Sequence, residues 1–242
     1  MRKELDLALA ARRQHLFPIV GTILGAAVAI IAFLLFSILG NQLSSLAISL
    51  LIVLFLYAVS GLIHLEGLAD FGDGVMTSGD AERKRAAMKD VSLGAAGIFL
   101  IVVNCILLIF LIGELDGWTD AIAPWIWGGS IPAVLGLILA ELSAKLSMLT
   151  VMFLGPSSHD GMGQLFVSAA NSRRFLIGVI LSISIAIALS WVYFFVVLIG
   201  IVVGVAITYM ARNHFGGVGG DAFGASNEIG RLAALLVWVI IL

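Results

Sequence analysis

The amino-acid sequence predicts an all-α, polytopic integral membrane protein that forms one helical bundle. Of its 242 residues, 61% are hydrophobic and 12% are charged, whereas a soluble domain is about half apolar and a quarter charged. The mean hydropathy is +1.15. The net charge of −2 argues against binding to nucleic acid, because it leaves no large basic face. We therefore expect a single domain, residues 1–242, embedded in a lipid bilayer.

Apolar segments of the length that a membrane span needs, roughly 20 residues, recur along the chain. The run from Phe175 to Ala211 is too long for one span, so we place a break between Ser190 and Tyr193. Residues 3–14 are predicted to form a short amphipathic helix on the membrane surface. The expected architecture has about six or seven transmembrane helices. The candidate spans are residues 17–39, 43–63, 94–113, 124–154, 175–192, 194–211 and 229–242.

The distribution of basic residues predicts the orientation of these spans. Lys and Arg cluster before the first candidate span and in the segments 64–92, 155–174 and 212–231. The segments on the other side contain no Lys or Arg, and residues 113–120 carry three acidic side chains instead. We therefore expect the N-terminus and the three basic segments to face the cytoplasm, as functional loops of a protein in the cell membrane.

The first of these loops opens with the sequence HLEGLADFGDG, which carries the carboxylates Glu66, Asp70 and Asp73. If the segment is helical, the spacing of four and three places these side chains on one face. Like charges on one face repel each other unless a cation neutralises them. Carboxylate oxygens are the ligands that Mg²⁺ and Mn²⁺ prefer. The motif therefore predicts a metal site, with a solvated helix end as the alternative.

The same loop continues with basic side chains that suit a phosphate or diphosphate group. Arg83 belongs to a basic run that ordinary positive-inside charge explains equally well. Lys89 and Asp90 are stronger candidates, because they precede Ser92 at the start of the next apolar segment. The N-terminus of a helix favours anions.

The last loop is rich in glycine and ends in polar residues. Glycines 216, 217, 219 and 220 precede Asp221, and Asn227 and Glu228 follow it. A glycine-rich turn lets backbone amides approach a phosphate, and the carboxylates offer further metal ligands. The middle loop, residues 155–174, fits a substrate contact through His159 and Asp160 and a plain loop equally well. Within the span 124–154, Glu141 and Lys145 are four residues apart, which predicts a structural ion pair, with a substrate-binding group as the alternative.

Three segments in this order resemble the cobalamin synthase family. They are HLEGLADFGDG, ERKRAAMKDVSLGAAG and GGVGGDAFGASNE. The resemblance covers most of the chain and implies a membrane transferase that joins adenosylcobinamide-GDP to α-ribazole or its 5′-phosphate and releases GMP. Two positions depart from the family pattern. Glu66 stands where the family usually has Asp, and Val91 separates Asp90 from Ser92.

The resemblance also implies roles for individual residues. Glu66, Asp70 and Asp73 would hold Mg²⁺, or Mn²⁺, on the diphosphate. Asp90 or Asp221 would be a further ligand or the base, so that the residues expected in catalysis are Asp70, Asp73, Asp90 and Asp221. The residues expected to contact substrate are His64, Arg83, Lys89, Ser92, Gly217, Gly220, Asn227 and Glu228.

Two other functions remain open at this point. A CDP-alcohol phosphotransferase shares the acidic spacing, but its continuous motif has Ala-Arg where this chain has Thr77 and Ser78. A secondary transporter would explain the charged residues inside a span, but it would show internal repeats, and we find no clear repeat. The small residues Gly21, Gly25 and Ala29 are spaced by four and predict a close helix contact within one chain or in a homo-oligomer.

Overall fold

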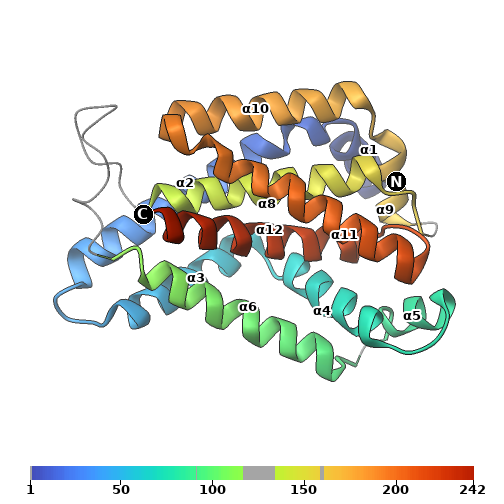
Figure 1. The fold of residues 1–242 in the computed structure, drawn as a ribbon, viewed down its shortest axis with the longest axis horizontal. Coiled ribbons are helices and arrows are strands. Elements are labelled where there is room, and N and C mark those ends of the chain that lie inside the picture. Colours follow the sequence, from blue (N-terminus) through green and yellow to red (C-terminus); the bar gives the residue numbers. More distant parts are fainter. Residues whose placement is uncertain (1, 91, 117–133, 159–160) are drawn as a thin grey trace.

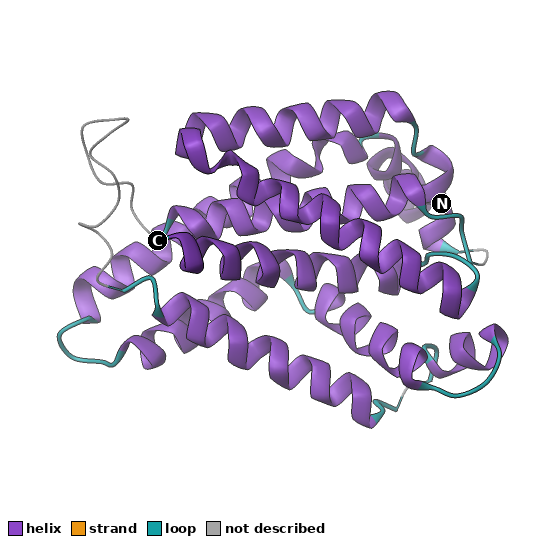
Figure 2. Ribbon diagram, viewed as in Figure 1, coloured by secondary structure: helices purple, strands orange, loops and turns teal. Residues whose placement is uncertain are grey.

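The structure, a computed structural model, describes residues 2–90, 92–116, 134–158 and 161–242 (Figure 1). In this part of the chain the regular elements are helices joined by loops (Figure 2). The first half contains α1 Arg2–Arg12, η1 Gln14–Leu16, α2 Phe17–Leu39, α3 Ser45–Ser60, α4 Ile63–Met76, α5 Ala81–Ala87 and α6 Ala95–Gly113. The second half contains α8 Leu135–Leu154, α9 Met162–Ala169, α10 Ser172–Ser190, η3 Trp191–Leu198, α11 Ile199–Phe215 and α12 Gly220–Ile241.

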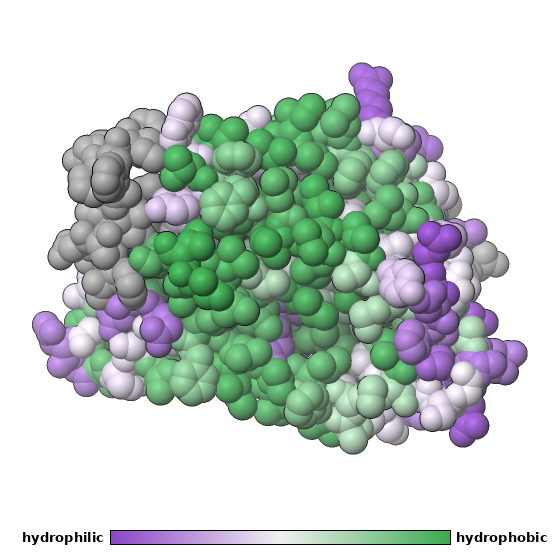
Figure 3. Space-filling view, viewed as in Figure 1, coloured by the Kyte–Doolittle hydropathy of each residue, from purple (hydrophilic) through white to green (hydrophobic). Residues whose placement is uncertain are grey.

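The prediction of a polytopic helical membrane bundle is confirmed. Among the described residues, 5 helical stretches are long and apolar enough to cross a membrane, or 6 if α3 and α4 form one bent span. These two helices meet at an angle of 95°, and Gly61 at the bend has a φ of 72°, which favours glycine. On the face that Figure 3 shows, apolar side chains cover the middle of the molecule, and polar side chains gather toward its two ends.

The long apolar run in the second half of the chain folds back on itself. Residues Ser172–Phe215 form one helical stretch of 44 residues, but α10 and α11 run in opposite directions (Figure 1). The reversal occurs at η3, and Trp191 at its start has a φ of 46°. The predicted break between Ser190 and Tyr193 is therefore confirmed.

The three segments predicted as loops contain more helix than expected. The segment 64–92 includes most of α4 and all of α5, and 155–174 includes α9. Helix α11 continues to Phe215 and the last helix begins at Gly220 rather than at residue 229, so the prediction of a loop over 212–231 is wrong outside residues 216–219. The physical reason is that the polar residues of α12 find buried partners inside the bundle, so the helix does not need a purely apolar sequence.

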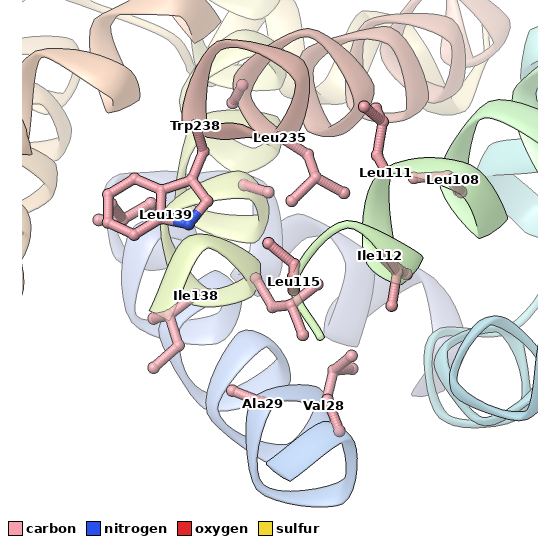
Figure 4. Packing of buried hydrophobic residues seen from close by; sticks show 14 of the residues in the cluster. Val28, Ala29, Leu108, Leu111, Ile112, Leu115, Ile138, Leu139, Leu235 and Trp238 are labelled. Carbon is pink, nitrogen blue, oxygen red and sulfur yellow. The ribbon is translucent and has the colours of Figure 1, made fainter. Parts of the chain in front are cut away.

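Helix α8 forms the centre of the bundle. In its most apolar stretch 89% of the residues are buried, and the helix packs against α2, α11 and α12. Leu139 of α8 and Trp238 of α12 are fully buried and belong to the same hydrophobic core (Figure 4). The predicted span 124–154 is thus seen from Leu135 onward, and its first residues lie outside the described part of the chain, as do residues 117–120, Val91, His159 and Asp160.

The predicted contact of the small residues in α2 is made within the chain. A Cβ atom on Gly25 would lie 2.6 Å from the Cα atom of Ile138, and one on Gly21 would lie 2.7 Å from the carbonyl oxygen of Glu141. These glycines let α2 and α8 approach at backbone distance. Figure 1 shows the two helices side by side over this length.

We predict that Gly25→Ala lowers the thermal unfolding midpoint of the detergent-solubilised protein. The added methyl group forces α2 away from the backbone of α8, and such overpacking costs about 1–3 kcal/mol. Gly113→Ala is the matched control, because a Cβ atom there meets nothing closer than 3.3 Å, at the hydroxyl of Ser49. Equal midpoints for the two variants would show that the α2–α8 approach is not close.

Candidate active site

A cavity of about 400 Å³ lies where α2, α4, α8, α9 and α12 meet. Its polar lining consists of His64, Glu66, Asp70 and Asp221. Its apolar lining includes Phe17, Met148, Met152, Phe166 and Phe223. We call this space the acidic cavity. It brings together all three segments that the sequence marks as functional, which lie far apart along the chain.

Helices α4 and α12 cross at a pair of glycines. A Cβ atom on Gly67 would lie 3.1 Å from the Cα atom of Gly224, and one on Gly224 would lie 2.8 Å from the carbonyl oxygen of His64. Only glycine allows two helices to approach this closely. Asp221 lies in the first turn of α12. The crossing therefore places Asp221 beside the acidic face of α4.

The acidic cavity concentrates negative charge. The carboxylates of Asp221 and Glu66 repel the negative charge of Asp70. The positive charge of Lys89 attracts that of Asp221. Among the described residues, no three His, Cys, Asp and Glu side chains are gathered closely enough to hold a metal ion. The donor type still suits Mg²⁺ or Mn²⁺, because such ions are commonly held by one or two carboxylates together with substrate phosphates and water.

Asp73 has a different environment from Glu66 and Asp70. Its Oδ2 accepts a hydrogen bond from the backbone N–H of Gly94 at 2.7 Å, and its Oδ1 accepts one from that of Gly97 at 2.8 Å. These amides belong to the first turn of α6, where backbone donors lack helical partners. Asp73 therefore joins α4 to the start of α6, and its expected role as a metal ligand stays a prediction.

A second, smaller cavity shares Asp221 with the first. Its polar lining includes Arg85, Lys89 and Ser158, and the glycine-rich turn lines it through Gly217 and Gly219. We call it the basic cavity. Backbone bonds hold its walls together: the N–H of Val218 donates to the carbonyl oxygen of Pro156 at 2.7 Å, and the N–H of Ser158 donates back to Val218 at 3.0 Å. Asp221 therefore lines both the acidic cavity and the basic cavity.

The basic residues of α5 connect this region to two helix C-termini. Lys84 donates to the carbonyl oxygen of Val75 at 3.1 Å, and Arg85 donates to that of Phe215 at 2.7 Å. Cations at these positions also favour the negative ends of the helices. Three further residues expected at the site, Arg83, Asp90 and Ser92, are exposed and line neither cavity. The backbone N–H of Ser92 donates to Asp90 at 2.9 Å.

A buried polar network extends from the acidic cavity into the bundle. Lys145 donates to Asn227 at 2.6 Å and lies 3.5 Å from Nε2 of His64, which lines the cavity. Asn227 donates to Glu228 at 3.1 Å. Glu228 in turn pairs with Arg231 at 2.5 Å.

The deeper half of this network joins four helices. Arg231 forms a salt bridge with Glu141 of α8. Glu228 accepts hydrogen bonds from Tyr57 of α3 at 2.9 Å and from Asn104 of α6 at 3.3 Å. The charged members of the network, Glu141, Lys145, Glu228 and Arg231, are at most 6% exposed. Such charges are stable in an apolar bundle only when they are paired.

The network corrects two expectations, the pairing of Glu141 with Lys145 and the position of Arg231 in a loop. Glu141 pairs with Arg231 of another helix rather than with Lys145, because the side chain of Arg231 enters the bundle from α12. Arg231 is therefore not a cytoplasmic loop residue. Asn227 and Glu228 are 0% and 1% exposed and do not line the acidic cavity, so their neighbours are these protein groups. His64 and Gly220 do line it, as expected.

Sequence reasoning missed the apolar lining of the acidic cavity. Phe17 and Phe166 come from α2 and α9, and Phe223 lies within the glycine-rich motif at the start of α12. No spacing rule links such residues, so the sequence held no signal for their meeting.

Comparison with known proteins gives a consistent result. The family model described as cobalamin-5-phosphate synthase matches residues 2–239. The adenosylcobinamide-GDP ribazoletransferase of Methanococcoides burtonii is 32% identical, over 93% of this chain and 81% of that protein. The protein of the same name from Thermococcus kodakarensis is also 32% identical, over 98% of this chain and 92% of its own length. No solved structure matches the chain.

We predict that Arg231→Met strongly destabilises the protein. The variant leaves Glu141 and Glu228 buried without their cation, and breaking a buried ion pair in this way costs about 3–5 kcal/mol. The matched control is Arg212→Met, because Arg212 is exposed near the end of α11. The thermal unfolding midpoint in detergent should fall for Arg231→Met alone. If both variants unfold at the wild-type temperature, the network contributes no stability.

We also predict that Asp73→Ala, measured with a metal chelator present, is less stable than Asp70→Ala. The first variant removes the acceptor of two amides at the start of α6, and loss of such a cap costs about 1–2 kcal/mol. Asp70→Ala removes a negative charge that neighbouring carboxylates repel, so it should cost less stability. A greater loss of stability for Asp70→Ala would contradict the assigned surroundings of Asp73.

Proposed function

This chain belongs to the cobalamin-5-phosphate synthase family, and from that premise we propose that it is a membrane-bound adenosylcobinamide-GDP ribazoletransferase. It would join adenosylcobinamide-GDP to α-ribazole, or to α-ribazole 5′-phosphate, and release GMP. The observation that carries the proposal is the meeting of Glu66, Asp70 and Asp221 on one cavity beside the basic lining of a second. The family match favours this reaction over the lipid phosphotransferase and the transporter that the sequence left open.

The reaction is a displacement at phosphorus. A ribose hydroxyl of the acceptor attacks the phosphorus atom that carries the cobinamide group, the bond from this atom to the bridging oxygen breaks, and GMP leaves with the electron pair. Such transfers depend mainly on positioning and on stabilisation of charge. The chain must therefore hold a diphosphate, orient a hydroxyl group and accept its proton.

The carboxylates divide these tasks according to their surroundings. Glu66 and Asp70 would hold Mg²⁺ or Mn²⁺, and the ion would neutralise charge on the diphosphate. Asp221 borders both cavities, so it is placed to take the proton of the attacking hydroxyl group. We assign no step here to Asp73, which binds backbone amides, or to Asp90, which lies outside both cavities, and their expected roles stay predictions.

The basic side chains suit the phosphate of the leaving GMP, which would lie at the mouth of the basic cavity, because the cavity's volume of about 20 Å³ holds little more than a water molecule. Lys89 and Arg85 line this cavity, and cationic side chains stabilise the charge that develops on a leaving phosphate. Gly217 lets the glycine-rich turn pack on the backbone of residues 156–158, since a Cβ atom there would lie 2.5 Å from the carbonyl oxygen of Pro156. The positive-inside rule would place this end of the bundle, and both substrates, on the cytoplasmic side of the cell membrane.

The test is transfer by the purified protein in liposomes, with adenosylcobinamide-GDP, α-ribazole and Mg²⁺. We predict that Asp221→Asn and Asp70→Asn each lower the rate of GMP release about 100- to 10,000-fold, the range for loss of a group that acts in the transition state. Glu82→Gln is the control, since Glu82 is exposed in the first turn of α5. Wild-type activity in Asp221→Asn would rule out its role as the base. A folded wild type that releases no GMP with either acceptor and either metal would contradict the proposed reaction.

A further inference from the structure

Three aromatic rings form a continuous row along the acidic cavity. The ring centroids of Phe17 and Phe166 are 6.1 Å apart, and those of Phe166 and Phe223 are 6.3 Å apart, within the range of aromatic contacts. All three residues line the cavity. We call this row the aromatic wall. It joins α2, α9 and α12, so it exists only in the folded bundle.

Helix α9, which carries the middle ring, is held in place by its backbone. The side chain of Gln14 is buried and donates to the carbonyl oxygen of Phe166 at 3.2 Å. A Cβ atom on Gly163 would lie 3.0 Å from the Cα atom of Gly219, so α9 also packs tightly on the glycine-rich turn. The wall is therefore a fixed surface, and replacing the Phe166 side chain leaves both of these contacts intact.

The chemistry of the wall selects one kind of base. Phe17, Phe166 and Phe223, with Met148 and Met152 beside them, offer no side-chain hydrogen-bond donors and only weak acceptors in sulfur. A guanine base carries several donors and acceptors, and those that face this wall would be buried without partners, which is costly. The base of α-ribazole, a dimethylbenzimidazole, has methyl groups and ring carbons along most of its edge. Of the two bases in the proposed reaction, the benzimidazole of the acceptor fits this surface.

The size of the cavity leads to the same assignment. Its volume of about 400 Å³ lies at the lower end of the range for pockets that bury a drug-sized ligand, about 300–1,000 Å³. A nucleoside fits such a space, and a corrinoid ring system does not. A nucleoside seated there would also keep its ribose in the cavity that Asp221 lines.

Resting on the proposed function, we infer that the aromatic wall is the subsite for the planar, weakly polar heteroaromatic base of the acceptor nucleoside. The base stacks on Phe166 between the neighbouring rings, and the ribose extends toward the carboxylates. The wall thereby determines which bases the enzyme accepts, separately from the groups that bind the diphosphate.

The experiment compares Phe166→Leu with Phe153→Leu in the transfer assay. Phe153 is the matched control, because it is also half-buried and in an aromatic pair, stacked on Phe175 with ring centroids 4.5 Å apart, but it does not line the cavity. We expect Phe166→Leu to raise KM for α-ribazole about tenfold, within the contribution of one aromatic side chain that stacks on a base. KM for adenosylcobinamide-GDP and kcat should stay within about twofold, and Phe153→Leu should match the wild type.

A second arm replaces α-ribazole with the corresponding adenine riboside. The wild type should use it with a higher KM, and this preference should shrink in Phe166→Leu but not in Phe153→Leu. The inference is overturned if Phe166→Leu leaves KM for α-ribazole unchanged, or raises the KM of both substrates equally. Failure of the proposed function is a different result, in which the wild type makes no product. Direct titration of the protein with α-ribazole then still tests the wall, and equal binding by Phe166→Leu and wild type, or none by either, would refute it.

Discussion

The close crossing of α4 and α12 at Gly67 and Gly224 is the constraint on which the site depends. Each glycine leaves room for the backbone of the other helix, and a side chain at either position would drive the helices apart. The approach brings Asp221 to the acidic face of α4, although about 150 residues of chain separate Asp70 from Asp221. The acidic cavity, its border with the basic cavity and the proposed division of labour among the carboxylates all follow from this contact.

The buried network holds the helices around this crossing in register. Lys145 of α8 reaches Asn227 of α12 and lies beside His64 of α4, while Arg231 ties α12 back to Glu141. Charges in an apolar interior cost least in the arrangement that pairs or hydrogen-bonds them. The network therefore favours a single packing of α8 and α12, and it does so directly beneath the site. Its two acidic and two basic members balance in formal charge, and among the described residues His64 is the one contact of the network that also lines the cavity.

Local patterns predicted the spans well, and they failed where the contacts cross the bundle. The first span was expected at residues 17–39 and is found at Phe17–Leu39, because hydropathy is a local property. The pairing of Glu141 with Lys145 followed the local helical rule, but the true partner, Arg231, is 90 residues away. The start of α12 was predicted as a loop because its residues are polar, and the partners that bury them lie on other helices. The position of Phe166 on the cavity could not be predicted from local sequence, because its ring contacts are with residues on two other helices.

The most direct test of the account is a single-particle structure of the protein in a lipid nanodisc with adenosylcobinamide-GDP and Mg²⁺ bound. The account predicts that the diphosphate lies between the first turn of α12 and the acidic face of α4, within reach of Glu66, Asp70 and Asp221. It also predicts that the corrinoid lies outside the acidic cavity. A diphosphate bound elsewhere, such as in the apolar groove that Phe71 and Phe99 line between α4 and α6, would contradict the account.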